Sequence, residues 1–132
     1  MSKELTLVGQ YIKDLSFENP MAPNLPSQNK NPNISLDINT TYLELKNNLH
    51  EVNLQLKSTA SLEKDIIFFI ELQYAGLFKC IIKSEEDKKK FIISGSYLLF
   101  PYARSIVSNT TMEGGFKPLV IQPIEFENIS QK

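Results

Sequence analysis

Hydrophobic and polar residues alternate along the first part of the chain, which predicts β-strands. Residues 5–17 alternate loosely and are expected to form the first strand. In that strand the odd-numbered residues from Tyr11 to Phe17 would face one side, and the even-numbered residues from Ile12 to Ser16 would face the other.

A period of two returns after Ser35 and again at Val52, Leu54 and Leu56, so two more half-buried strands are expected. A polar turn at residues 61–65 follows them. Successive strands with short connections favour an antiparallel sheet.

The next strand, expected from Ile66 to Ala75, is apolar on more than one face. One row of alternating side chains contains Phe68, Ile70, Leu72 and Tyr74, and the other contains Ile67, Phe69, Glu71 and Gln73. One row is enough to cover the core of the domain itself. The apolar groups on the second row therefore predict a partner surface and an oligomeric protein.

A helical spacing follows the strands. Ser84 and Asp87 resemble an acidic variant of a capping box, which predicts that a helix begins there. The apolar spacing stops at residues 114–115, where glycine can adopt the left-handed conformation that ends helices. Pro101 lies inside the pattern and predicts a kink. Residues 116–127 are expected to be extended.

The segment at residues 19–33 differs from its surroundings. It contains four prolines and five asparagines, which disfavour regular structure. A loop of this length is uncommon in a compact domain unless it has a function. The total length of 132 residues fits a single domain over residues 1–132.

The charge balance narrows the possible partners. The chain has 14 basic and 15 acidic side chains, a formal charge of -1, which gives no general attraction to nucleic acid. The N-terminus lacks the apolar core of a signal peptide, and no apolar run approaches the roughly 20 residues of a membrane helix. The single cysteine, Cys80, excludes an internal disulfide and suits a reducing compartment. A cytoplasmic protein without direct membrane insertion is expected.

Few side chains could support catalysis. His50 is the only histidine and Cys80 the only cysteine, too few for a structural zinc site within one chain. His50 stands at the entrance of a strand, where a structural or solvent-exposed role is expected. Cys80 is expected to be a buried, inert thiol. The prediction is a protein that is not an enzyme and uses no cofactor or metal.

Two short segments carry a more specific signal. Residues 14–20 read Asp-Leu-Ser-Phe-Glu-Asn-Pro, and residues 96–104 read Ser-Tyr-Leu-Leu-Phe-Pro-Tyr-Ala-Arg. In this order and at this separation they closely resemble the SecB family of protein-export chaperones, and the resemblance spans about residues 11–126. It implies an α+β fold with a four-stranded antiparallel sheet, a long crossover loop after the first strand, and a kinked helix packed on one face. It also implies a homotetramer built as a dimer of dimers.

The resemblance implies an ATP-independent chaperone of the cytoplasm. Such proteins bind unfolded precursor proteins, keep them export-competent and deliver them to the SecA motor of the Sec translocase. This function requires exposed apolar grooves that hold extended peptide without reading a strict sequence.

The matched motifs also imply where SecA docks. The implied docking residues are Asp14, Glu18, Phe69 and Glu71, although leucine is the familiar residue at the position of Phe69. Phe69 and Glu71 fall in one row of their predicted strand, so they are expected to share a face.

Two further groups of residues are expected to be functional. The opposite row of the same strand matches positions tied to tetramer assembly, namely Ile70, Leu72 and Tyr74. The client groove is expected to involve one residue of the crossover loop and two near the helix bend, namely Leu25, Tyr97 and Phe100.

The sequence departs from familiar members of the family. The crossover loop has Pro26 and Lys30 where aromatic residues are expected. The sequence stops at Lys132, so the amphipathic C-terminal helix and acidic tail are expected to be truncated. The near-neutral charge predicts weaker and more salt-sensitive docking to a basic SecA tail.

Two other hypotheses stay open. A SecB-like chaperone could serve one dedicated partner, such as the antitoxin of a toxin–antitoxin system. It would then ignore the generic unfolded precursors that an export chaperone accepts. A small enzyme or ligand-binding domain would have to depend on His50 or Cys80.

Overall fold

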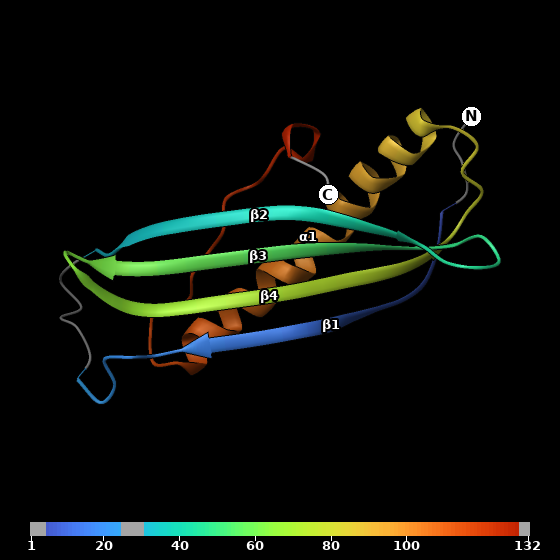
Figure 1. Ribbon diagram of the computed structural model, residues 1–132. Coiled ribbons are helices and arrows are strands. Elements are labelled where there is room, and N and C mark those ends of the chain that lie inside the picture. Colours follow the sequence, from blue (N-terminus) through green and yellow to red (C-terminus); the bar gives the residue numbers. More distant parts are fainter. Residues whose placement is uncertain (1–4, 25–30, 130–132) are drawn as a thin grey trace.

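Four antiparallel strands form one sheet, and a long helix lies across one of its faces (Figure 1). The computed structural model describes residues 5–24 and 31–129. The strands are β1 (Thr6–Glu18), β2 (Asn33–Glu44), β3 (Leu49–Leu62) and β4 (Asp65–Lys79). Their order across the sheet is β1-β4-β3-β2, so β1 and β2 are the edge strands. The predicted α+β class and antiparallel sheet are confirmed.

Two tight turns join the last three strands. Asn47 and Asn48 connect β2 to β3 with φ values of 64° and 59°. Asparagine tolerates this left-handed conformation better than most residues that carry a Cβ. Glu63, with φ of 56°, lies in the turn between β3 and β4. The predicted turn at residues 61–65 therefore shortens to the few residues between the two strands.

The helix α1 (Glu85–Glu113) begins at the predicted cap. The hydroxyl oxygen of Ser84 accepts a hydrogen bond from the backbone N–H of Asp87 at 3.0 Å. This bond satisfies one of the donors that a helix leaves unpaired at its N-terminus. The acidic side chains of the first turn add a favourable interaction with the helix dipole.

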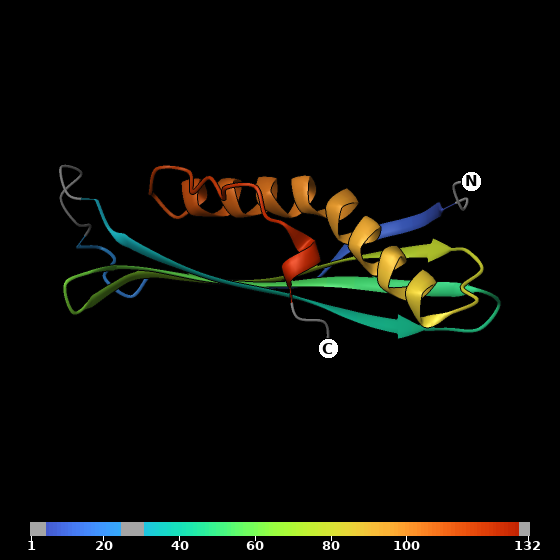
Figure 2. The same ribbon diagram turned by 90° about the horizontal axis from the view of Figure 1, so that it is seen from above.

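The other end of α1 closes at the predicted glycines. The N–H of Phe116 donates to the carbonyl of Thr111 at 3.1 Å. Gly115 has φ of 94°, which glycine adopts without steric strain. Pro101 lies inside the helix without ending it. Figure 2 shows that α1 bends partway along its length, as a proline inside a helix predicts.

Every fourth residue along one side of α1 is buried against the sheet. This series contains Phe91, Gly95, Leu99, Ala103, Val107 and Thr111. The sheet contributes alternate residues of its two central strands to the same core, including Leu54, Leu56, Ile70 and Leu72. The spacing of four on the helix and of two on the strands therefore builds a single layer of apolar contacts.

Lys13 forms a β-bulge that changes the predicted faces of β1. Ile12 lies opposite Tyr74 and Asp14 lies opposite Gln73, so Lys13 is an extra residue with no partner in the register. The prediction that Tyr11 shares a face with Leu15 and Phe17 is therefore wrong. Tyr11 shares a face with Asp14, whereas Ile12 lies on the helix-covered face together with Leu15 and Phe17.

Ile67 also leaves its predicted row. The pairing of β3 with β4 shifts between Ala60 opposite Phe68 and Ser61 opposite Ile66. Ile67 is buried with Ala60 and Phe68 in a small second cluster. The second face of β4 keeps Phe69 and Leu77 beside Glu71 and Gln73, and the partner surface that its sequence predicts stays a prediction.

Residues 116–125 lie in the segment expected to be extended. They belong to no strand of the sheet and run along α1 (Figure 2). The hydroxyl of Ser108 donates to the carbonyl of Leu119 at 2.6 Å, and the N–H of Leu119 donates to the hydroxyl oxygen of Thr111 at 2.9 Å. The segment thus bonds to helix side chains instead of joining the sheet. It ends in a short 3-10 helix, η1 (Phe126–Asn128).

The C-terminus of α1 is attached to the end of β1. Asn19 donates through Nδ2 to the carbonyl of Gly114 at 3.0 Å. The ring of Phe17 covers Gly114 so closely that an added Cβ would lie 2.4 Å from a ring carbon. Phe17 also packs against Phe68 and Phe116. Phe17 and Asn19, both from the motif at residues 14–20, therefore hold the C-terminal end of α1 in place, Phe17 through an aromatic cluster.

Gly114→Ala should lower the free energy of unfolding by about 1–3 kcal/mol, because the new methyl group has to displace the packed Phe17 ring. Gly9→Ala is the matched control, since an added Cβ at Gly9 meets nothing within 4 Å. It should leave stability unchanged or raise it slightly. Urea denaturation at one fixed protein concentration compares the two variants. Equal stability of the two would contradict this account of the contact.

Candidate functional site

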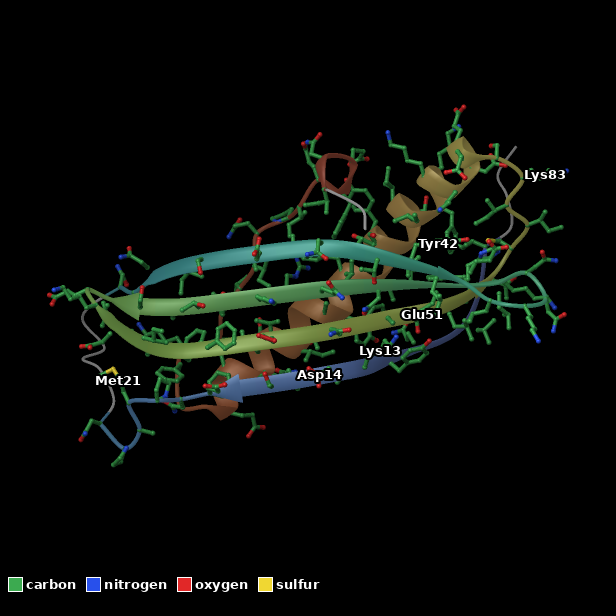
Figure 3. The ribbon with its side chains drawn as sticks, in the orientation of Figure 1. Lys13, Asp14, Met21, Tyr42, Glu51 and Lys83 are labelled. Atoms are coloured by element: carbon green, nitrogen blue, oxygen red, sulfur yellow. The ribbon has the colours of Figure 1, made fainter. Side chains whose placement is uncertain are left out.

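The face of the sheet opposite α1 is the candidate functional site. Figure 3 looks at the sheet with the helix behind it and shows Asp14, Lys13 and Glu51 on this side of the molecule. One row across this face, Asn39, Gln55, Gln73 and Asp14, is polar in all four strands, whereas neighbouring rows include apolar residues such as Phe69 and Leu77. An open face with charged and polar side chains suits a protein partner that is recognised by charge and hydrogen bonds.

The register brings the expected docking residues together at one end of this face. Glu18 lies directly opposite Phe69, and Glu71 lies opposite Ser16, the residue between Asp14 and Glu18 on that side. Side chains paired in this way have Cβ atoms about 5 Å apart. Asp14 and Glu18 are exposed, whereas Phe69 and Glu71 are partly buried. The resulting patch is acidic with one aromatic ring, and its role stays a prediction.

A lysine lies beside this acidic patch. Lys57 of β3 stands directly opposite Glu71 on one side and Asp37 on the other. Opposite charges across strands attract, so Lys57 offsets part of the negative charge of Glu71. This neighbour was not expected from the sequence, because the three residues are brought together only by the pairing of β2, β3 and β4.

A second charged cluster lies further along the same face. Lys13 Nζ lies 3.0 Å from Glu51 Oε1, and the Tyr11 hydroxyl donates to Glu51 Oε2 at 2.7 Å. Burial, the hydrogen bond to Glu51 and the negative charge of Glu51 raise the pKa of Tyr11 to about 12. Sequence reasoning missed this cluster, and no local motif could have shown it, because Glu51 comes from a different strand.

Two amide oxygens in the middle of this face lack a hydrogen-bond partner among the described residues. They are the Oδ1 atoms of Asn39 and Asn53, both buried. The Nδ2 group of Asn53 does donate to Gln73 Oε1 at 3.0 Å. A buried carbonyl oxygen normally accepts a hydrogen bond from protein or water.

The residues expected to support tetramer assembly lie on the other face, under the helix. Ile70, Leu72 and Tyr74 are all buried in the core of the chain itself. The hydroxyl of Tyr74 accepts a hydrogen bond from Gln10 at 2.8 Å, and its ring stacks against Tyr102 at 6.3 Å between centroids. Any effect of these residues on assembly would therefore act through the position of α1.

The two helix residues expected in the client groove lie together against the C-terminal segment. The ring of Phe126 meets Tyr97 edge-on at 5.1 Å and Phe100 at 5.7 Å between centroids. The Tyr97 hydroxyl donates to Glu127, which lowers the pKa of the Glu127 carboxyl and raises the pKa of Tyr97. Phe100 is buried and Tyr97 is exposed. Leu25 lies outside the described residues.

The candidate catalytic residues have structural surroundings. His50 is buried, with Nδ1 2.7 Å from the Tyr42 hydroxyl and Nε2 3.2 Å from the carbonyl of Cys80. Cys80 is only partly buried, because it follows the end of β4, so the expectation of a buried thiol is corrected. Over residues 5–24 and 31–129, no cluster of three or more His, Cys, Asp or Glu side chains could hold a metal ion. No helix in the same part of the chain is long and apolar enough to cross a membrane.

Comparison with known proteins gives a consistent result. A family model described as preprotein translocase subunit SecB matches residues 1–132. The protein-export protein SecB of Rickettsia akari is 44% identical over 97% of this chain and 86% of that relative. The protein-export protein SecB of Methylocella silvestris is 44% identical over 89% of this chain and 74% of that relative.

One solved structure has the same fold. It is the Mycobacterium tuberculosis Rv1957 SecB-like chaperone in complex with a ChAD peptide from the Rv1956 HigA1 antitoxin. The TM-score is 0.77, with 13% identity, over 91% of this chain and 90% of that chain. At this identity the likeness concerns the arrangement of the strands and the helix.

Glu51→Gln should lower the pKa of Tyr11 from about 12 toward its ordinary value, because the negative charge of Glu51 is removed. In the wild type the raised pKa of Tyr11 supports folding fully below about pH 10, and this support is lost as the pH rises to about 12. Ultraviolet titration of the tyrosines measures the change, and Tyr11→Phe identifies the Tyr11 step. If Tyr11 titrated at the same pH in Glu51→Gln as in the wild type, the contact between Tyr11 and Glu51 would be contradicted.

Proposed function

The chain belongs to the SecB family of protein-export chaperones, and on that premise we propose that it binds unfolded precursor proteins and delivers them to SecA. The observation that carries this proposal is the match of the SecB family model to residues 1–132. The chaperone would act without ATP, metal or cofactor, keep its clients export-competent, and work in the cytoplasm. We treat residues 1–132 as one SecB-like domain, with the crossover loop at about 19–33.

The acidic patch on the open face is the proposed docking surface for the basic tail of SecA. Asp14, Glu18 and Glu71 supply negative charge, and Phe69 lies opposite Glu18 as an apolar contact. Electrostatic complementarity of this kind steers association and makes it sensitive to salt. Lys57 opposite Glu71 reduces the local charge, which supports the expectation of weak docking.

Two apolar surfaces support assembly of a homotetramer as a dimer of dimers. The first is the edge strand β1, whose exposed apolar residues are Leu7, Val8, Tyr11, Ile12 and Leu15. An unpaired edge of 13 residues with this composition is suited to pairing with a second copy. The second surface is a side of α1 beside the sheet, where Leu98 is 37% exposed and Tyr102, whose ring stacks on Tyr74, is 50% exposed. Exposed apolar groups gathered on one helix side favour contact between dimers.

The proposed client groove contains the aromatic cluster of Tyr97, Phe100 and Phe126, together with Leu25. Aromatic rings give apolar contact area without demanding a particular sequence. Several such sites on one tetramer would bind one long client more tightly than a single site does.

The alternative of a chaperone dedicated to one antitoxin has less support. The solved structure that suggests it is 13% identical to this chain, whereas the relatives named as protein-export proteins reach 44%. Binding of generic unfolded precursors would decide against a dedicated partner.

Light scattering coupled to size exclusion should give four times the 15.1 kDa chain mass and co-elution with a denatured precursor, but not with its folded form. Tyr102→Glu should shift the tetramer toward dimer, because the half-exposed ring of Tyr102 lies in the proposed contact along the side of α1. Leu72→Glu is the contrasting variant and should unfold the chain, because Leu72 is 1% exposed in the core. A monomeric wild type that ignores unfolded clients would overturn the proposal.

Glu71→Lys should weaken binding of the cognate SecA tail about tenfold at low salt, because the change reverses one charge of the acidic patch. Lys57→Gln should strengthen it by about two- to threefold, since Lys57 lies opposite Glu71. Calorimetric titration at about 0.05 M and 0.5 M salt measures both effects, which should shrink at the higher concentration. Salt-independent affinity combined with no effect of Glu71→Lys would exclude this surface.

A further inference from the structure

The bulge in β1 places a positive charge beside the acidic docking patch. Tyr11 and Asp14 both pair with residues of the open face, and Lys13 is the extra residue between them. The ammonium group of Lys13 reaches Glu51 on the same face. Lys13 and Asp14 are therefore consecutive residues whose side chains share one face, an arrangement that regular alternation forbids.

Glu51 holds this lysine away from the patch. One carboxylate oxygen of Glu51 binds Lys13 at 3.0 Å, and the other accepts the Tyr11 hydroxyl at 2.7 Å. The side chain of Glu51 is 11% exposed and that of Lys13 is 40% exposed. Two bonds to a largely buried carboxylate give a more defined geometry than an exposed ion pair has.

The direction of the contact matters for docking. Glu51 lies opposite Leu77 of β4. Asp14 lies opposite Gln73, which is four residues closer to the N-terminal end of the same strand. Figure 3 shows Lys13 and Glu51 on the same side of Asp14 along the sheet. The ammonium group is thus drawn away from Glu71 and Glu18, which lie beyond Asp14 in the other direction.

We infer that Glu51 is a positioning residue of the docking surface, which binds the ammonium group of Lys13 and so leaves the carboxylate of Asp14 available to a basic partner. This inference rests on the proposed docking of SecA. A lysine released beside Asp14 would compete with the basic groups of the partner, because two unit charges a few ångströms apart attract appreciably at a protein surface. Glu51 itself need not touch SecA.

The test compares three variants in binding of the cognate SecA tail. Glu51→Gln should weaken binding about three- to fivefold at about 0.05 M salt, and the loss should nearly vanish at about 1 M. The double variant with Lys13→Gln and Glu51→Gln should bind within about twofold of the wild type, since no lysine remains to compete. Glu86→Gln is the matched control. It also removes one carboxylate and frees a lysine, because Glu86 pairs with Lys90 at 3.3 Å on the helix.

A second measurement needs no SecA. Labelling with an amine-reactive reagent, read by mass spectrometry, should find Lys13 protected in the wild type relative to the exposed Lys89. The protection should disappear in Glu51→Gln. Circular dichroism and thermal melting confirm that each variant is folded.

The outcomes separate the inference from the function on which it rests. If the wild type does not bind the SecA tail, the proposed function fails and the inference fails with it. If the wild type binds but Glu51→Gln binds equally well, only the inference is wrong. If the double variant remains as weak as Glu51→Gln, the carboxylate of Glu51 contacts the partner itself and the positioning role is wrong. Equal labelling of Lys13 and Lys89 in the wild type would also overturn it.

Discussion

Both faces of the sheet depend on one constraint, namely which side chains of β1 point to which face. Side chains alternate strictly along a strand, so one extra residue exchanges the faces of all that follow. Lys13 is the second such residue in β1, after Val8, and it comes just before the first motif. Because of it, Phe17 reaches the aromatic cluster at the helix end, while Asp14 and Glu18 reach the open face.

Each face then has a separate role. The covered face is a close-packed apolar layer, in which every fourth residue of α1 meets alternate residues of the central strands. The open face is polar, and its charges are distributed in two clusters, one around Glu71 and one around Glu51. The proposed docking surface therefore lies on the face of the sheet opposite the packed core.

Exposed apolar side chains lie on both edge strands, β1 and β2, and along one side of α1, among other places. Exposed apolar groups of this kind are typical of surfaces that bind other chains, so they suit the proposed assembly and client binding. The C-terminal segment covers part of the same helix, with Phe126 against Tyr97 and Phe100. The aromatic residues near Pro101 thus have a partner within the chain as well as a proposed role toward clients.

Much of the fold could be predicted because its signals are local. The cap at Ser84, the glycine end of α1 and the alternation of β4 from Phe68 to Tyr74 all join residues that are close in the chain, and each is present as expected. The two family motifs also identified the family correctly. Local hydrogen bonds and side-chain periodicity need no knowledge of distant neighbours.

The tertiary structure alone decided how distant segments meet. The bulge at Lys13, the burial of Ile67 and the irregular course of residues 116–125 all depend on partners that local patterns do not reveal. The contact of Lys13 with Glu51 joins residues 38 positions apart. Such contacts follow from strand register, which is fixed by the total packing of the sheet and helix. The sequence by itself therefore determined the elements and the family, while the register determined which side chains share a face.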